Sequence, residues 1–185
     1  FRSIYQLSDF LTFSNDHVIM LNYQDVTLKA RVSTIGNMES RLVDLGAIYL
    51  GEDHQHDFYF TCSKGKLKFR QGTLGTLITH YERTVLEKAE KTQVYRYDVN
   101  PSAEEVHQLY AMHEMIGETQ KIRKLYQLDN ITIHLDELPS GEKFIEVEAK
   151  DYAEMLSEEQ LNLQCQKLFE DLQLAHVDRL ETGYL

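Results

Sequence analysis

The clearest structural signal in the chain is the stretch Asp25-Val-Thr-Leu-Lys-Ala-Arg31. Polar or charged residues occupy its odd positions, and aliphatic residues occupy its even positions. Successive side chains of a β-strand point to opposite faces, so this period of two predicts a strand over residues 24–32 with one polar and one apolar face.

The same alternation recurs along the chain, in segments that differ in the sign of their charge. Cations come from Lys66, Lys68, Arg70, Lys121 and Arg123, and further polar positions are Thr132, His134, Asp136, Glu146 and Glu148. A single strand of this kind is usually a solvated face of an antiparallel sheet. Five or more suggest a sheet that curls with its charged faces inward. Such a polar tunnel requires water and a compensating ligand, because unpaired buried charge is very costly.

The remaining elements are predicted from turn residues, caps and periodicity. Asn37 and Gly46 bound a short helix over residues 37–45, and Ser102 with Glu105 forms a capping box for a helix over residues 103–115 that ends at Gly117. A third helix is predicted over residues 157–172, and further strands over 17–23, 56–62, 64–71, 77–83 and 93–98. No linker is evident, so we expect one α+β domain over residues 1–185, with residues 1–20 unassigned.

Composition excludes several classes of protein. The chain of 185 residues is 42% hydrophobic, which is typical of a globular protein. Its formal net charge of −11 disfavours generic binding to nucleic acid or to an anionic membrane. Residues 1–97 carry 12 basic and 11 acidic residues (+1), whereas residues 98–185 carry 7 and 19 (−12). Cys62 and Cys165 cannot build a disulfide scaffold, so we expect a reducing compartment, the cytoplasm.

A ligand that needs both signs of charge is a polyphosphate with a metal ion. Lys and Arg neutralise phosphate oxygens, and Arg offers two parallel N–H donors. Carboxylates beside such cations suit Mg²⁺ or Mn²⁺, which prefer oxygen ligands and often bridge proteins to phosphates. The pattern therefore favours phosphoryl-transfer chemistry.

Seven segments, taken in order, resemble the CYTH family of triphosphate tunnel metalloenzymes, which includes class IV adenylate cyclases and thiamine triphosphatases. They are Asp25-Val-Thr-Leu-Lys29-Ala-Arg31, Gln55-His-Asp57-Phe-Tyr59-Phe, Gly65-Lys-Leu-Lys-Phe-Arg70, Leu77-Ile-Thr-His-Tyr-Glu-Arg83, Lys121-Ile-Arg123-Lys-Leu-Tyr126, Ile133-His-Leu-Asp136-Glu and Phe144-Ile-Glu146-Val-Glu148. The resemblance covers residues 24–150, and the cyclase-like subgroup fits best.

This resemblance implies an antiparallel eight-stranded β-barrel tunnel with helices packed outside, a small-molecule triphosphate and Mg²⁺ or Mn²⁺. Carried over by position, the metal ligands are Asp25, Glu146 and Glu148. Catalytic roles fall to Glu146, Glu148, Lys29 and Asp136. The substrate-binding residues are Lys29, Arg31, Lys66, Lys68, Arg70, Arg83, Lys121, Arg123 and His134. His134 is either a general base or a hydrogen-bonded structural residue.

The chain departs from the family pattern at two positions. Thr27 replaces the second acid of the opening motif, and Thr132 stands where the family usually has an arginine. Relative to the family pattern, the chain thus lacks one acidic metal ligand and one basic phosphate ligand, which leaves the local charge nearly unchanged. We therefore expect triphosphate binding to be preserved better than the precise placement of the metal ion. Hydrolysis of a triphosphate (inorganic tripolyphosphate, or a nucleoside or thiamine triphosphate) is the leading hypothesis, and the two threonines favour the alternative of binding without catalysis. Cyclisation of ATP to cyclic AMP and binding without catalysis are the alternatives, and the protein is either a monomer or a homodimer.

Two weaker hypotheses concern other side chains. His54, His56 and Cys62 have poor spacing for a zinc site. The tyrosines that alternate at strand spacing favour wall packing over stacking on a substrate base; they are Tyr59, Tyr81, Tyr95 and Tyr97.

Overall fold

A computed structural model describes residues 21–85, 90–153, 155–174 and 179–180 of the chain. The strands are β1 Leu21–Val32, β2 Ile48–Phe60, β3 Lys66–Gln71, β4 Thr76–Val85, β5 Glu90–Val99, β6 Met115–Leu128, β7 Ile131–Glu137, β8 Lys143–Asp151 and β9 Arg179–Leu180. The helices are α1 Gly36–Asp44, α2 Ala103–Met112 and α3 Glu158–Asp171. Of the strand predicted over residues 17–23, residues 17–20 lie outside the described part.

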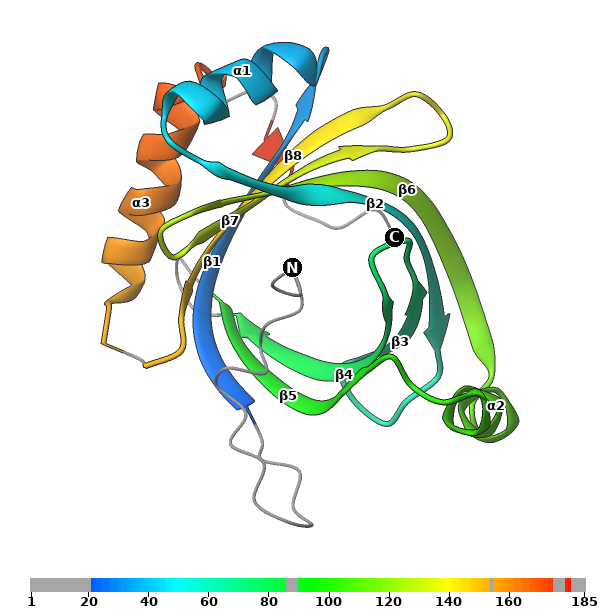
Figure 1. Ribbon diagram of the computed structural model, residues 1–185. Helices are drawn as coiled ribbons and strands as arrows, with labels where there is room; N and C mark the ends of the chain where they lie inside the picture. The colour runs from blue at the N-terminus through cyan, green and yellow to red at the C-terminus, as the bar shows by residue number, and fades with distance from the viewer. Residues whose placement is uncertain (1–20, 86–89, 154, 175–178, 181–185) are drawn as a thin grey trace.

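Strands β1 to β8 form a closed antiparallel ring, which confirms the predicted eight-stranded architecture (Figure 1). The order around the ring is β5-β4-β3-β2-β6-β7-β8-β1, and pairing of β5 with β1 closes it. Strand β9 continues the sheet beside Lys29 and Ala30 of β1, beyond the end of the β1–β5 pairing. Closure leaves two surfaces for the alternating side chains, one inside the ring and one outside.

The apolar faces of the strands point outward and are covered by helices. Helices α1 and α3 lie together on one side of the ring and α2 lies on the opposite side (Figure 1). The larger core cluster joins Val26 and Ala30 of β1 with Ile133, Val147 and residues of α1 and α3. The smaller cluster packs Leu109 of α2 against β2, β3 and β4. Burial of these apolar faces under helices leaves the polar faces to line the inside.

The helix ends test the predicted caps. Ser102 and Glu105 form the predicted capping box of α2, and Ser157 forms a second one with Gln160 at the start of α3. The prediction for Asn37 is wrong, because it lies inside α1, whose N-cap position is Ile35 without a side-chain cap. Gly46 has the predicted left-handed conformation, with φ of 86°.

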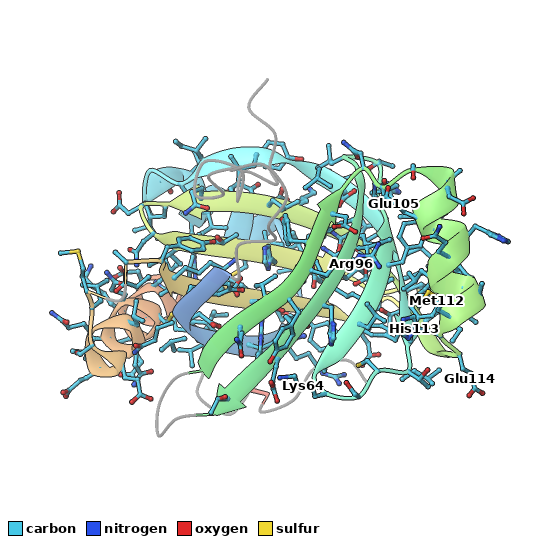
Figure 2. All side chains as sticks on the ribbon, turned by 90° about the horizontal axis from the view of Figure 1, so that it is seen from below. Lys64, Arg96, Glu105, Met112, His113 and Glu114 are labelled. Atoms are coloured by element: carbon cyan, nitrogen blue, oxygen red, sulfur yellow. The ribbon has the colours of Figure 1, made fainter. Side chains whose placement is uncertain are left out.

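The predicted end of the second helix is also wrong. Helix α2 ends at Met112, because His113 is extended (φ −133°, ψ 138°) and its Nδ1 lies 2.8 Å from the Thr61 carbonyl oxygen (Figure 2). The Glu114 amide donates to Thr61 Oγ1 at 3.1 Å, so the chain joins β2 and enters β6. Gly117 therefore lies within β6 rather than ending a helix. Strand β2 likewise begins at Ile48, before the predicted start at residue 56.

None of the helices in the described part of the chain combines the length and apolar character needed to cross a membrane.

The packing of α3 predicts the effect of truncating one of its leucines. Leu161→Ala removes a fully buried side chain between α3 and the sheet, so the free energy of unfolding should fall by about 2–5 kcal/mol. Leu163→Ala is the matched control, because Leu163 lies on the same helix and is 56% exposed. Urea unfolding of both variants measures the difference. Equal losses would contradict the assignment of the inner face of α3.

Candidate functional site

The inside of the ring is lined by ionised side chains that the sheet keeps from solvent. Register places Lys29 opposite Glu146 and Arg123 opposite Asp136, with both members of each pair on the inner face. The buried polar residues in the described part of the chain include Asp25, Lys29, Asp53, Gln55, Asp57, Arg70, Thr79, Thr92, Lys121, Arg123, His134, Asp136 and Glu148. This lining concentrates both signs of charge in one interior, as the strand alternation predicts.

Two similar Asp–Arg pairs form the basic part of the site. Asp57 of β2 accepts two hydrogen bonds from Arg70 of β3, at 2.5 and 2.6 Å. Asp136 of β7 accepts two from Arg123 of β6, both at 2.6 Å. Each aspartate thereby fixes the plane of its guanidinium group from a neighbouring strand.

A lysine accompanies each Asp–Arg pair. Lys68 Nζ lies 3.6 Å from Asp57 Oδ2, and Lys121 Nζ lies 3.8 Å from Asp136 Oδ2. Burial together with the adjacent Arg70 lowers the pKa of Lys68 to about 8. Burial together with the adjacent Arg123 lowers the pKa of Lys121 to about 7. An anion beside these lysines would raise both pKa values, so we expect anion binding at neutral pH to take up protons.

The acidic part of the site is centred on β8. Glu146 Oε1 lies 3.3 Å from His134 Nδ1, while Glu146 Oε2 faces Arg123 at 3.6 Å and Lys29 at 3.7 Å. Burial opposes ionisation of Glu146, but Arg123 and the hydrogen bond with His134 outweigh it and hold the pKa of Glu146 well below its usual value. Burial and the nearby Arg123 lower the pKa of His134, which favours the neutral imidazole.

The second acid of β8, Glu148, also contacts cations. Its Oε2 lies 2.9 Å from Lys150 Nζ, and its Oε1 lies 3.8 Å from Arg83 Nη2. Among the described residues, His134, Glu146 and Glu148 form a group whose ligand atoms all lie within 4.8 Å of one another. One nitrogen and two carboxylate donors at this spacing fit a divalent cation.

Asp25 is not a member of this group, although the family resemblance assigns it to the metal. It is fully buried, and it accepts hydrogen bonds from Thr92 Oγ1 at 2.8 Å and from Thr27 Oγ1 at 3.3 Å. Burial and the nearby Glu148 raise the pKa of Asp25 to about 6. The carboxyl group is therefore held by two hydroxyl groups rather than placed among the candidate ligands.

Two of the predicted phosphate-binding residues lie at strand ends. The side chain of Arg31 is 58% exposed, and its Nη1 lies 2.7 Å from Glu142 Oε1. Lys66 is also exposed, at the first position of β3. Both continue an alternation that is buried further along the strand, so sequence spacing alone could not separate them from Lys29 or Lys68.

Sequence reasoning gave no role to several interior residues, among them Asp57, Lys150, Thr79 and Gln55. Asp57 and Lys150 continue alternations, Gln55-x-Asp57 on β2 and Glu148-x-Lys150 on β8, which could have identified them. Thr79 Oγ1, on the inner face of β4, is buried with no hydrogen-bond partner, as is Gln55 Oε1 on β2. Buried polar atoms without partners are rare in native proteins. These two are consistent with an interior that receives a polar ligand.

The zinc hypothesis finds no support on the outer wall. His54 Nε2 lies 3.0 Å from Glu52 Oε1, His56 Nε2 lies 2.9 Å from Glu118 Oε2, and Cys62 Sγ donates to the Lys64 carbonyl. These contacts hold the three side chains apart.

The alternating tyrosines divide between the two faces. The Tyr95 hydroxyl donates to Glu82 at 2.6 Å, and Glu82 also forms an ion pair with Lys64. Burial raises the pKa of Tyr97 to about 12. Tyr59 and Tyr97 share the inner face with Lys68 and Thr79, which are their register partners.

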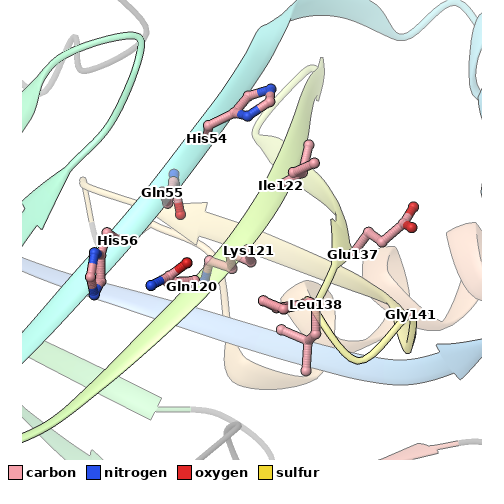
Figure 3. Close-up of a pocket in the computed structure, with 10 residues that line it drawn as sticks. His54, Gln55, His56, Gln120, Lys121, Ile122, Glu137, Leu138 and Gly141 are labelled. Atoms are coloured by element: carbon pink, nitrogen blue, oxygen red, sulfur yellow. The ribbon is translucent and has the colours of Figure 1, made fainter.

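A pocket of about 460 Å³ opens where β6 separates from β7 (Figure 3). In the described part of the chain, β6 pairs with β7 only from Ile122 onward. The pocket is lined by inner-face residues, Gln55 and Lys121, and by residues of the outer wall and of the β7–β8 turn, including His54, Glu137 and Leu138. The shortness of β7 therefore leaves an opening in the wall that reaches an interior lysine.

The CYTH domain matches residues 24–184, and the chain belongs to this family. The family is metal-dependent, which agrees with the donor group of His134, Glu146 and Glu148. No curated protein matches the chain significantly.

Solved structures with the same fold come from distant relatives. The PH1012 protein from Pyrococcus horikoshii OT3 is 21% identical, with a TM-score of 0.72, and the match covers 86% of this chain and 96% of that one. A Vibrio parahaemolyticus protein, assigned provisionally as an adenylate cyclase, is 16% identical with a TM-score of 0.70 and coverages of 86% and 94%. HpAC1 from Hippeastrum, described as having a dominant triphosphatase activity, is 11% identical with a TM-score of 0.59 and coverages of 88% and 92%.

The raised pKa of Asp25 predicts how stability depends on pH. The pKa of Asp25 is 3.8 in the unfolded chain and about 6 in the folded protein, so the folded protein holds this proton more tightly. Protonation of Asp25 therefore stabilises the folded state fully below about pH 4, and this contribution is lost as the pH rises through 6. The free energy of unfolding of Asp25→Asn relative to the wild type should therefore increase between pH 4 and 7, by on the order of 2–3 kcal/mol at about 1.4 kcal/mol per pKa unit. Denaturant unfolding in the presence of a chelator measures this difference.

Asp44→Asn, at an exposed position at the end of α1, is the control for loss of one negative charge. A difference between Asp25→Asn and the wild type that stays constant over this pH range would contradict the assignment.

Proposed function

We propose that this protein hydrolyses a triphosphate in a metal-dependent reaction inside its ring of strands. The carrying observation is the enclosure of two fixed guanidinium groups, Arg70 and Arg123, beside the carboxylates of Glu146 and Glu148. A polyphosphate needs the guanidinium groups, and its divalent ion needs the carboxylates. In the protein without ligand, the interior cations pair with interior carboxylates. A bound polyphosphate and its ion would take over some of these contacts.

The residues divide into two roles in this reaction. Lys29, Lys68, Arg70, Lys121 and Arg123 bind phosphate oxygens and neutralise the charge that develops during transfer. A guanidinium group has five N–H donors, of which the aspartate accepts two, so a phosphate can bind while Asp57 and Asp136 keep their arginines in place. Glu146, Glu148 and His134 hold the divalent ion, which supplies Lewis-acid polarisation when it is bound.

Water is the nucleophile in this proposal. Asp25, with its raised pKa of about 6, is an interior carboxyl group that can exchange a proton near neutral pH. It lies on the inner face of β1, which pairs with β8, near Glu148. Asp136 acts through Arg123 and is a positioning residue.

A second candidate function is binding of a polyphosphate or nucleotide without turnover. It is favoured by one observation: Thr27 and Thr132 are the register partners of Glu148 on β1 and β7, so neither neighbouring strand places a charged side chain directly opposite this acid. A misplaced metal ion would slow the reaction, since a displacement of about 1 Å can reduce the rate by roughly 100-fold. Cyclisation of ATP would use the same interior, with the ribose hydroxyl in place of water.

One set of measurements separates these functions. Purified protein is incubated with tripolyphosphate, ATP or thiamine triphosphate and with Mg²⁺ or Mn²⁺, and phosphate release and cyclic AMP are both measured. We expect phosphate release without cyclic AMP. Thermal stability is recorded on the same samples, because a ligand that binds only the folded state must stabilise it. Stabilisation without product would identify a binding protein, and no stabilisation by any triphosphate would exclude both functions.

Lys66 and Lys68 of β3 differ in exposure, and this difference predicts how much each contributes to substrate binding. Lys68→Ala should weaken binding of tripolyphosphate about 10- to 100-fold, because a hydrogen bond to a charged group contributes roughly 1.5–3 kcal/mol in a desolvated site. Lys66→Ala, two residues away on the same face but exposed, should change the affinity less than about threefold. Isothermal titration calorimetry measures both. Equal losses would show that the ligand binds at the strand ends rather than in the interior.

A further inference from the structure

Two threonines, Thr27 of β1 and Thr132 of β7, are the register partners of Glu148. Thr27 Oγ1 donates to Asp25 Oδ2 at 3.3 Å, and Thr132 Oγ1 donates to Gln127 Oε1 at 3.2 Å. Each hydroxyl group thus donates to a residue other than Glu148. A divalent ion on Glu148 must find its remaining donors elsewhere.

His134 lies one step along the inner face of β7 from Thr132, directly opposite Glu146. The side chains of His134, Glu146 and Glu148 are 10%, 19% and 7% exposed, so all three are largely withdrawn from solvent. Glu146 presents Oε1 to His134 and Oε2 to Arg123 and Lys29. The imidazole and the two cations therefore contact different oxygens of the Glu146 carboxylate.

The spacing of this group fits an ion at its centre. Donors of a divalent ion lie at roughly 2.0–2.2 Å from it, so neighbouring and opposite donors are roughly 3–4 Å apart. The ligand atoms of His134, Glu146 and Glu148 lie within 4.8 Å of one another, which requires only a small contraction. Asp25, held by the hydroxyl groups of Thr92 and Thr27, is not part of the group.

We propose that His134 is a nitrogen ligand of the divalent ion, and that it gives this protein a preference for Mn²⁺ over Mg²⁺. The proposal rests on the proposed metal-dependent function. Mg²⁺ takes oxygen donors almost exclusively and keeps several waters, whereas imidazole binds first-row transition ions well. With a threonine opposite Glu148 on β1 and an imidazole on β7, the donors available around β8 are a mixed set of oxygen and nitrogen.

Pulsed electron paramagnetic resonance on Mn²⁺-loaded protein tests this directly, because a nitrogen bonded to Mn²⁺ gives a resolved hyperfine coupling. We expect that coupling in the wild-type protein and its loss in His134→Gln, which retains hydrogen-bonding capacity toward Glu146. His54→Gln is the matched control: it makes the same substitution on the outer wall, where His54 contacts Glu52, and should leave the spectrum unchanged.

Metal affinity provides the second readout, measured by calorimetry with each ion alone. The wild-type protein should bind Mn²⁺ at least about tenfold more tightly than Mg²⁺. His134→Gln should lose at least about tenfold in Mn²⁺ affinity and less than about threefold in Mg²⁺ affinity. Circular dichroism and thermal unfolding establish that the variant is folded.

The outcomes separate this inference from the function on which it rests. Wild-type protein that binds Mn²⁺ without a nitrogen coupling would overturn the role of His134 and leave the metal-dependent reaction intact. Protein that binds neither ion, alone or with tripolyphosphate, would overturn the proposed function as well. Because the wild-type spectrum decides the first question, the test stands even if His134→Gln fails to fold.

Discussion

The structure depends on the pairing of buried charges across neighbouring strands. Arg70 with Asp57 and Arg123 with Asp136 are bidentate pairs in which each aspartate is at most 1% exposed. Removing one member of such a pair would leave an isolated charge in a poorly solvated interior, which is strongly destabilising. The pairs join β2 to β3 and β6 to β7, so they fix inner-face geometry at two separate places in the ring.

Placement of the charges inside reverses the usual relation between core and surface. The apolar side chains that would fill a small barrel lie instead on the outside, where α1, α3 and α2 cover them. A helix-covered outer face supplies the hydrophobic stabilisation, and the interior is left for chemistry. The cost of desolvation is visible in the lowered pKa values of Lys68 and Lys121 and in the raised pKa of Asp25. Each is a group that a ligand of the right charge would shift back toward its ordinary state.

The acidic part of the site differs from what the family resemblance implies, and the difference is local. Thr27 lies on the inner face of β1 and donates a hydrogen bond to Asp25, while His134 lies beside Glu146. The group of candidate metal donors among the described residues, His134, Glu146 and Glu148, therefore combines nitrogen with oxygen.

The sequence by itself determined which side chains share a face, because alternation in a strand is a property of the local backbone. From it came the inner-face assignment of Lys29, Lys68, Arg123 and Glu146, and the closed eight-stranded ring followed from the family resemblance. The helix end at Met112 could not be predicted, since it depends on a contact between His113 and the distant Thr61.

Only the tertiary structure decided which members of a face are buried and which partners they meet. Arg31 and Lys66 obey the same alternation as Lys29 and Lys68, yet they lie at strand ends and are exposed. The association of Asp25 with Thr92 depends on the pairing of β1 with β5, two strands far apart in the chain, and that of His134 with Glu146 depends on the register of the β7–β8 hairpin. The closure of the ring, in which β1 meets β5, depends on the packing of the whole sheet, so no local pattern could reveal it.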